Sequence, residues 1–277
     1  VTARGWDDLS EMIKLYEENG LAVDEQLICQ YLQDARISKD FAIYYDLFNK
    51  YRSDYQVEKI LDGTVSESIV LRAERASMDE RLSLLGLIFD SVMAQLRTVC
   101  ERENILDLVT GQLKTLKEKL KDVSGAAALL SKMIEAEREK LERGKQSSSI
   151  SPQTQRETRF MLEYLEEFRA AVMQSGTAQK DEFSIVRESF AQKVAELKGL
   201  AADGGRALEN VFSFCEKAFA DGDEILIFVT ELTANYYSAR FIGRYGCDRY
   251  YMHNKQLQFD QRQQEIIKRM DEIQWTV

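Results

Sequence analysis

The stretch ILDLVTGQLKTLKEKLKDV, residues 105–123, decides the fold class. Its apolar residues recur every three or four positions with lysine and glutamate between them, which is the spacing of one face of an α-helix. Two heptads and a fraction are short for a free coiled coil, so the stretch predicts a helix of a bundle. The apolar positions are Ile105, Val109, Leu113, Leu116, Leu120 and Val123.

Apolar residues recur at helical spacing over most of the chain on both sides of this stretch. Charged residues make up 30% of the sequence and hydrophobic residues 44%, and there is one proline in 277 residues. Average usage would give roughly 14 prolines. Because proline lacks an N–H and breaks helix interiors, its near absence argues for helices throughout. We predict an all-α fold.

The lengths of the predicted helices divide the chain into two parts. Residues 1–63 predict a small bundle of three to four helices, and residues 64–277 a bundle of longer, coiled-coil-like helices. Gly144 to Pro152 combines three consecutive serines with the only proline and predicts an exposed loop. In the second part we also predict a helix end near Gly199 and one buried helix from Glu224 to Phe241.

Within the first part, local signals place three helix boundaries. Gly20 predicts the end of the first helix, and Asp24 and Ser38 are candidate N-caps of the second and third. The third helix carries an aromatic stripe that we expect to be core. The stripe consists of Phe41, Tyr44, Tyr45, Phe48 and Tyr51.

Net charge and cysteine usage narrow the classes of function. The formal charge of −10 and the pI of about 4.9 disfavour binding to nucleic acid or to an anionic membrane. No apolar run approaches ~18 residues and the N-terminus does not resemble a signal peptide, so we expect a cytoplasmic chain without a membrane span. The four scattered cysteines predict free thiols, and the single histidine, His253, argues against histidine-based metal or triad chemistry.

The opening Thr2-Ala3-Arg4-Gly5-Trp6 carries the one family resemblance. It resembles the start of the α-helical lid of AAA+ ATPases, in particular the MoxR-like branch, where Thr/Ser-Pro-Arg is followed by a tryptophan and a helix. The resemblance assigns Arg4 the role of the second-sensor arginine, which reaches the γ-phosphate of ATP. Ala3 stands where the family usually has proline, and the resemblance covers roughly the first fifth of the chain with a short motif.

The resemblance implies further expectations about cofactors and partners. The chain contains no GxxxxGK[ST] phosphate loop, and at Gly144-Lys145 the required first glycine is Glu139. ATP and magnesium would therefore bind only in the full-length protein, and the isolated chain would not be an enzyme. The missing initiator methionine fits a piece of a longer protein. Protein clients or adaptors, and a homo-oligomeric ring formed through the ATPase core, are the implied partners.

A second feature is the segment Tyr236 to Tyr251, in which aromatic residues alternate with arginines. The residues proposed to contact a partner are Arg240, Arg244, Tyr245, Arg249 and Tyr250. Internal packing of the same side chains and a platform for single-stranded nucleic acid remain alternatives. Arg244 and Arg249 flank Cys247 and are expected to lower its pKa.

Two other classes of function remain open beside the ATPase-linked one. A non-enzymatic helical scaffold or adaptor fits the coiled-coil-like helices. A hydrolase or metalloenzyme is a weaker alternative, because a di-metal site built from Glu and ExxH pairs needs a histidine on each of two helices and this chain has one histidine. A site made of carboxylates alone stays open.

Overall fold

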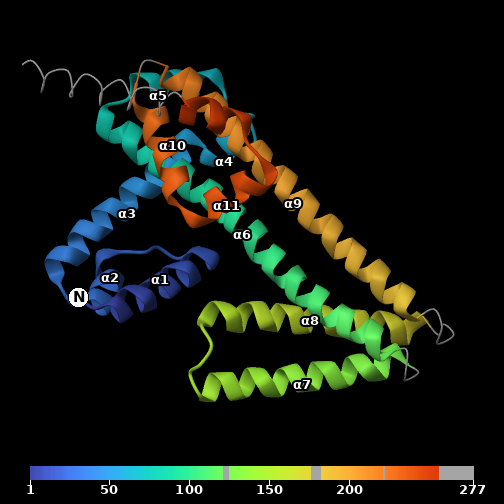
Figure 1. Cartoon of the computed structure of the whole chain (residues 1–277). Coiled ribbons are helices and arrows are strands. Elements are labelled where there is room, and N and C mark those ends of the chain that lie inside the picture. Colours follow the sequence, from blue (N-terminus) through green and yellow to red (C-terminus); the bar gives the residue numbers. More distant parts are fainter. Residues whose placement is uncertain (121–124, 176–181, 221, 256–277) are drawn as a thin grey trace, which may run out of the picture. The chain divides into compact units, whose positions relative to one another are not determined.

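The computed structural model describes residues 1–120, 125–175, 182–220 and 222–255 (Figure 1). In these ranges the chain forms α-helices and no strand, which confirms the predicted all-α fold. The helices belong to two compact units. Unit 1 comprises Val1–Ser91 and Asn210–Ile225, and unit 2 comprises Val92–Glu209 and Leu226–Val277. The boundary expected near residue 63 lies inside unit 1, and the division drawn from the sequence stays a prediction.

Unit 1 is built from two stretches of chain that are far apart in sequence. Its N-terminal stretch contains five complete helices and the start of a sixth, and its second stretch supplies the end of one long helix and the start of the next. These helices are α1 (Ala3–Glu18), α2 (Glu25–Leu32), α3 (Ala35–Tyr55), α4 (Val57–Leu61), α5 (Glu67–Arg75), α6 (Met78–Lys119), α9 (Glu182–Ala218) and α10 (Glu224–Ala234).

The helix ends in unit 1 follow two of the three predicted signals. Gly20 follows α1 at φ +66°, and the Asp24 carboxylate caps α2 by accepting the N–H of Leu27 over 2.8 Å. The N-cap of α3 is Asp34, however, and not Ser38, which is buried inside the helix. One oxygen of the Asp34 carboxylate accepts the backbone N–H groups of Arg36 and Ile37 at 3.0 Å each, which starts the helix one turn before Ser38.

The first three helices have a small core. Only Leu9, Ile28 and Leu32 are buried together there. The aromatic stripe of α3 was expected to be core, but none of its five rings is fully buried. Phe41 packs against this core, whereas Tyr44 is 58% exposed. Three helices of this size enclose too little volume to cover five aromatic rings.

The core of unit 2 gathers around residues 105–120 of α6. Ile105, Val109 and Leu116 are buried, and Leu113 and Leu120 pack against them, while Val123 lies outside the described residues. The other contributing helices are the adjoining part of α9, α7 (Ala126–Gln146) and α8 (Pro152–Ser175). Figure 1 shows α7 and α8 side by side.

The predicted loop between α7 and α8 is shorter than expected. Helix continues to Gln146 and resumes at Pro152, so only residues 147–151 form the turn, with exposed serines. Ile150 folds back onto Gly144, where an added Cβ would lie 2.8 Å from the Ile150 Cδ1 atom. The glycine is therefore buried helix and not part of an exposed loop.

Two helix boundaries predicted in the second part of the chain are wrong. α9 runs unbroken through Gly199, because a glycine costs a helix only about 1 kcal/mol and packing on either side outweighs that loss. The apolar segment from Glu224 forms two helices, α10 and α11 (Tyr236–Tyr245). Asn235 separates them, since its side-chain oxygen accepts the N–H of Tyr237 over 2.9 Å and caps α11.

Candidate functional site

Arg4 lies in the first turn of α1. The Thr2 hydroxyl caps this helix by accepting the Gly5 N–H over 3.1 Å. The Arg4 side chain is 91% exposed, and its Nε atom lies 3.8 Å from the Asp8 carboxylate. An exposed pair of this kind contributes little stability, so the guanidinium is available to a second molecule.

Gly5 explains one part of the motif that follows Arg4. A Cβ at this position would lie 2.8 Å from the carbonyl oxygen of Tyr31, which is closer than real Cβ contacts. The glycine therefore allows α1 to approach α2. Trp6 points to a different surface, where its ring meets Phe41 edge-on with centroids 5.1 Å apart.

The side chains between α1 and α3 form a shallow groove of about 300 Å³, which we call the aromatic groove. Apolar and aromatic side chains dominate its lining, and Lys14 and Glu17 are the charged residues. Tyr45 donates its hydroxyl hydrogen to Glu17 over 2.7 Å, and burial together with this carboxylate raises the pKa of Tyr45. The lining residues are Trp6, Leu9, Ser10, Ile13, Lys14, Glu17, Phe41, Tyr44, Tyr45 and Phe48.

Glu103 of α6 gathers three of the side chains proposed to contact a partner. Its carboxylate is 2% exposed and lies 3.0 Å from each of Arg240 and Arg244, and Tyr245 donates to it over 2.5 Å. Burial and the Glu103 carboxylate raise the pKa of Tyr245 to about 12. One buried acid thus fixes the polar face of α11.

The remaining two predicted contact residues also bond within unit 2. Arg249 pairs with Glu209 over 3.1 Å, and the buried Tyr250 hydroxyl lies 3.0 Å from the hydroxyl of Thr233. Cys247 lies 3.4 Å from the same Glu209. Burial raises the pKa of this thiol to about 12, so the lowered pKa expected from the neighbouring arginines is wrong.

These contacts correspond to the internal-packing alternative for the arginine- and tyrosine-rich segment. Partner binding by its exposed atoms stays a prediction. Glu103 was not among the site residues predicted from the sequence, although the sequence contains a signal for it. The residue occupies a position on the apolar stripe Leu96, Val99, Glu103, Leu106, and an acid at such a position is buried with bonding partners.

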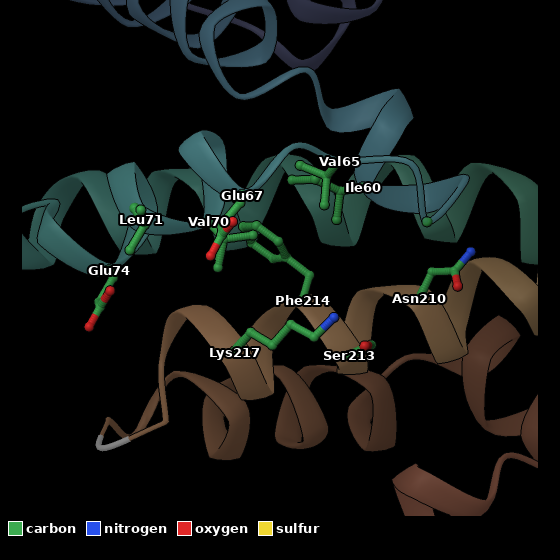
Figure 2. A pocket seen from close by; sticks show the side chains of 11 residues that line it. Ile60, Val65, Glu67, Val70, Leu71, Glu74, Asn210, Ser213, Phe214 and Lys217 are labelled. Carbon is green, nitrogen blue, oxygen red and sulfur yellow. The ribbon is translucent and has the colours of Figure 1, made fainter.

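Unit 1 also contains a cavity of about 500 Å³. Figure 2 shows side chains of α9, among them Ser213, Phe214 and Lys217, facing side chains of α4, α5 and the segment between them. The size falls in the range of small-molecule sites. Its full lining is Ile60, Gly63, Val65, Glu67, Val70, Leu71, Glu74, Asn210, Ser213, Phe214 and Lys217.

Comparisons with protein-family models, curated proteins and solved structures give no match. Within the described ranges, no three histidine, cysteine, aspartate or glutamate side chains lie close enough together to hold a metal ion. Arg4 is far in sequence from the charged groups around Glu103, and it belongs to unit 1 whereas they belong to unit 2.

One described helix, α6, is long and apolar enough to cross a membrane when judged by length and composition alone. Core helices of soluble proteins pass the same test, and 44% of the most apolar window of α6 is buried. The expectation that no segment spans a membrane therefore stays a prediction.

Proposed function

We propose that this chain is the C-terminal helical region of a MoxR-like AAA+ ATPase that remodels client proteins in the cytoplasm. In this proposal the first helices form the lid over a nucleotide bound by a preceding domain, and the longer helices contact clients or adaptors. The observation that carries the proposal is the exposed Arg4 guanidinium at the capped start of α1, in the sequence context that resembles the lid.

The physical chemistry of Arg4 suits this role. Arginine stays protonated at all physiological pH values, and its planar guanidinium can bind two phosphate oxygens at once. The first turn of a helix adds a partial positive charge that favours an anion nearby. Asp8 is 54% exposed in its pair with Arg4, so exchanging this carboxylate for a phosphate costs little.

The decisive experiment uses the full-length gene product. Arg4→Ala is expected to lower ATP turnover by about 100-fold, the size of effect seen when a charge-stabilising group is removed. Arg36→Ala is the matched control, since Arg36 is an exposed arginine on the same three helices. Turnover at the wild-type rate in the Arg4 variant would remove this residue from the mechanism, and rapid ATP hydrolysis by residues 1–277 alone would contradict the proposed division of labour.

A non-enzymatic scaffold or adaptor is the second candidate, favoured by the long α6–α9 helices and their common apolar core. The genomic sequence separates the two. A GxxxxGK[ST] sequence roughly 150–200 residues upstream in the same reading frame supports the ATPase, because a nucleotide domain has about that size. A start codon immediately before Val1 supports the scaffold.

A further inference from the structure

The aromatic groove leaves much apolar surface exposed for so small a group of helices. Trp6 is 39% exposed and Tyr44 58%, and Leu47 on the next turn of α3 is 41% exposed. Trp6 and Tyr44 line the same groove, and apolar surface gathered in this way is typical of a contact with another molecule. Both walls are helices, α1 and α3, and an apolar groove between helices is the usual setting for a bound amphipathic helix.

The charges around the aromatic groove indicate the sign of its partner. Residues 1–56 carry eleven acidic and six basic side chains. On α1, Asp7, Glu11 and Glu18 are each three or four positions from Ser10 or Lys14 of the lining, so they lie next to the groove on the helix surface. None of these three acids forms an ion pair within the described part of the chain.

We propose that the aromatic groove binds an amphipathic helix of a partner protein that carries lysine or arginine beside its apolar anchors. The anchors, spaced three or four residues apart, enter between the Trp6 and Tyr44 rings, and the basic flanks pair with the unpaired acids of α1. An anionic membrane is repelled by these same acids. A second copy of the chain brings a formal charge of −10 and is disfavoured likewise. Arg4 and nucleotide take no part in this site.

A pair of synthetic helices tests the sign of charge directly. The probe is a fluorescent peptide of about 18 residues with leucine and tryptophan at helical spacing and lysine on both flanks, and its twin carries glutamate in place of lysine. Anisotropy titrations of the full chain are expected to give saturable binding of the lysine peptide, at least ~10-fold weaker binding of the glutamate peptide, and weaker binding at higher salt.

Two matched pairs of variants locate the site. Tyr44→Ser is expected to weaken binding of the lysine peptide by about 10-fold, whereas Tyr236→Ser, at another exposed tyrosine, changes it less than about twofold. The double variant Asp7→Lys/Glu11→Lys is expected to weaken binding similarly, and Asp107→Lys/Glu118→Lys is its exposed control on α6. Circular dichroism of each variant establishes that the helices are retained.

Several outcomes overturn the proposal. They are equal affinity for the two peptides, no saturable binding of either, and equal losses in the Tyr44 and Tyr236 variants. Sedimentation that reveals a dimer abolished by Tyr44→Ser would make a second copy the occupant. If the chain bound phosphatidylserine vesicles and Tyr44→Ser abolished that binding, the occupant of the groove would be a lipid surface.

Discussion

The guanidinium of Arg81 lies 3.0 Å from the carboxylate of Glu224, although 143 residues separate the two in sequence. Both belong to unit 1, where they join the start of α6 to the start of α10. Glu224 is 2% exposed, and its second oxygen has no hydrogen-bond partner among the described residues. Arg81 also donates to the backbone carbonyls of Glu74 and Ala76.

Replacing Arg81 by methionine is expected to destabilise the chain by about 3 kcal/mol, because the buried Glu224 carboxylate loses its counter-charge. Arg75→Met is the control, since Arg75 is exposed and forms no ion pair within the described residues. Urea unfolding of both variants measures the difference. Equal stabilities would show that Glu224 does not depend on Arg81.

A second prediction concerns the Glu103 cluster. Glu103→Gln removes the charge that faces Arg240 and Arg244 and is expected to cost about 2–4 kcal/mol, less than for a fully buried pair because Arg244 is 57% exposed. Glu101→Gln breaks the more exposed pair with Arg97 and is expected to cost less than about 1 kcal/mol. Chemical denaturation that ranks the two variants in the opposite order would contradict this reading of the cluster.

Two glycines are expected to respond to alanine with opposite signs. Gly63 has φ +73°, and a Cβ there would lie 2.8 Å from the Asn210 side chain, so Gly63→Ala is expected to cost about 1–3 kcal/mol. Gly199 lies in the middle of α9 with open space around it. Gly199→Ala is expected to stabilise by about 0.5–1 kcal/mol, which thermal unfolding of the two variants will test.

The fold class could be predicted from the sequence because a helix depends on residues that are close together along the chain. The spacing of apolar residues from Ile105 to Leu120 and the scarcity of proline both indicate helix without reference to distant parts of the chain. Boundaries were less predictable. Aspartate and serine are both favoured at N-caps, and Asp34 and Ser38 lie one turn apart, so residue type alone does not choose between them.

The candidate sites depended on long-range contacts that no local pattern records. Glu103 and Arg240 are 137 residues apart in sequence, so the sequence pattern around one gives no sign of the other. The aromatic stripe of α3 was assigned to the core because its spacing is the same whether a helix or solvent faces it. The exposure of Tyr44 depends on how few helices surround it, which is a tertiary property.

The thiols provide a prediction about reactivity. Burial raises the pKa values of Cys100, Cys215 and Cys247, and the reactive thiolate is therefore scarce at these positions near neutral pH. Cys29 is only half-buried. Iodoacetamide at pH 8 is expected to label Cys29 first in the native chain and all four in urea, as read by peptide mass spectrometry. Rapid native labelling of Cys215 would contradict the buried core around it.

A final prediction concerns alkaline pH. The buried Tyr55 phenol donates to Glu80 over 2.7 Å, and burial, with this carboxylate second, raises the pKa of Tyr55 from 10.0 to about 12. Because the folded state prefers the protonated phenol, its contribution is complete below pH 10 and is lost as the pH rises through about 12. The stability difference between wild type and Tyr55→Phe should stay constant from pH 8 to 10 and shrink above pH 10. A constant difference through pH 11 would argue against this shift.

Unit 1 consists of two stretches that are far apart in sequence, and this affects how the chain folds during its synthesis. Unit 1 is complete only when residues 210–225 have been made. The faces of α4 and α5 that meet Asn210 and Phe214 therefore stay uncovered while residues 92–209 are translated. At typical elongation speeds this delay is on the order of ten seconds, long compared with the formation of any single helix. The ribosome thus exposes an unfinished apolar surface for a period in which chaperones can bind it, and a truncation before residue 210 would leave that surface open permanently.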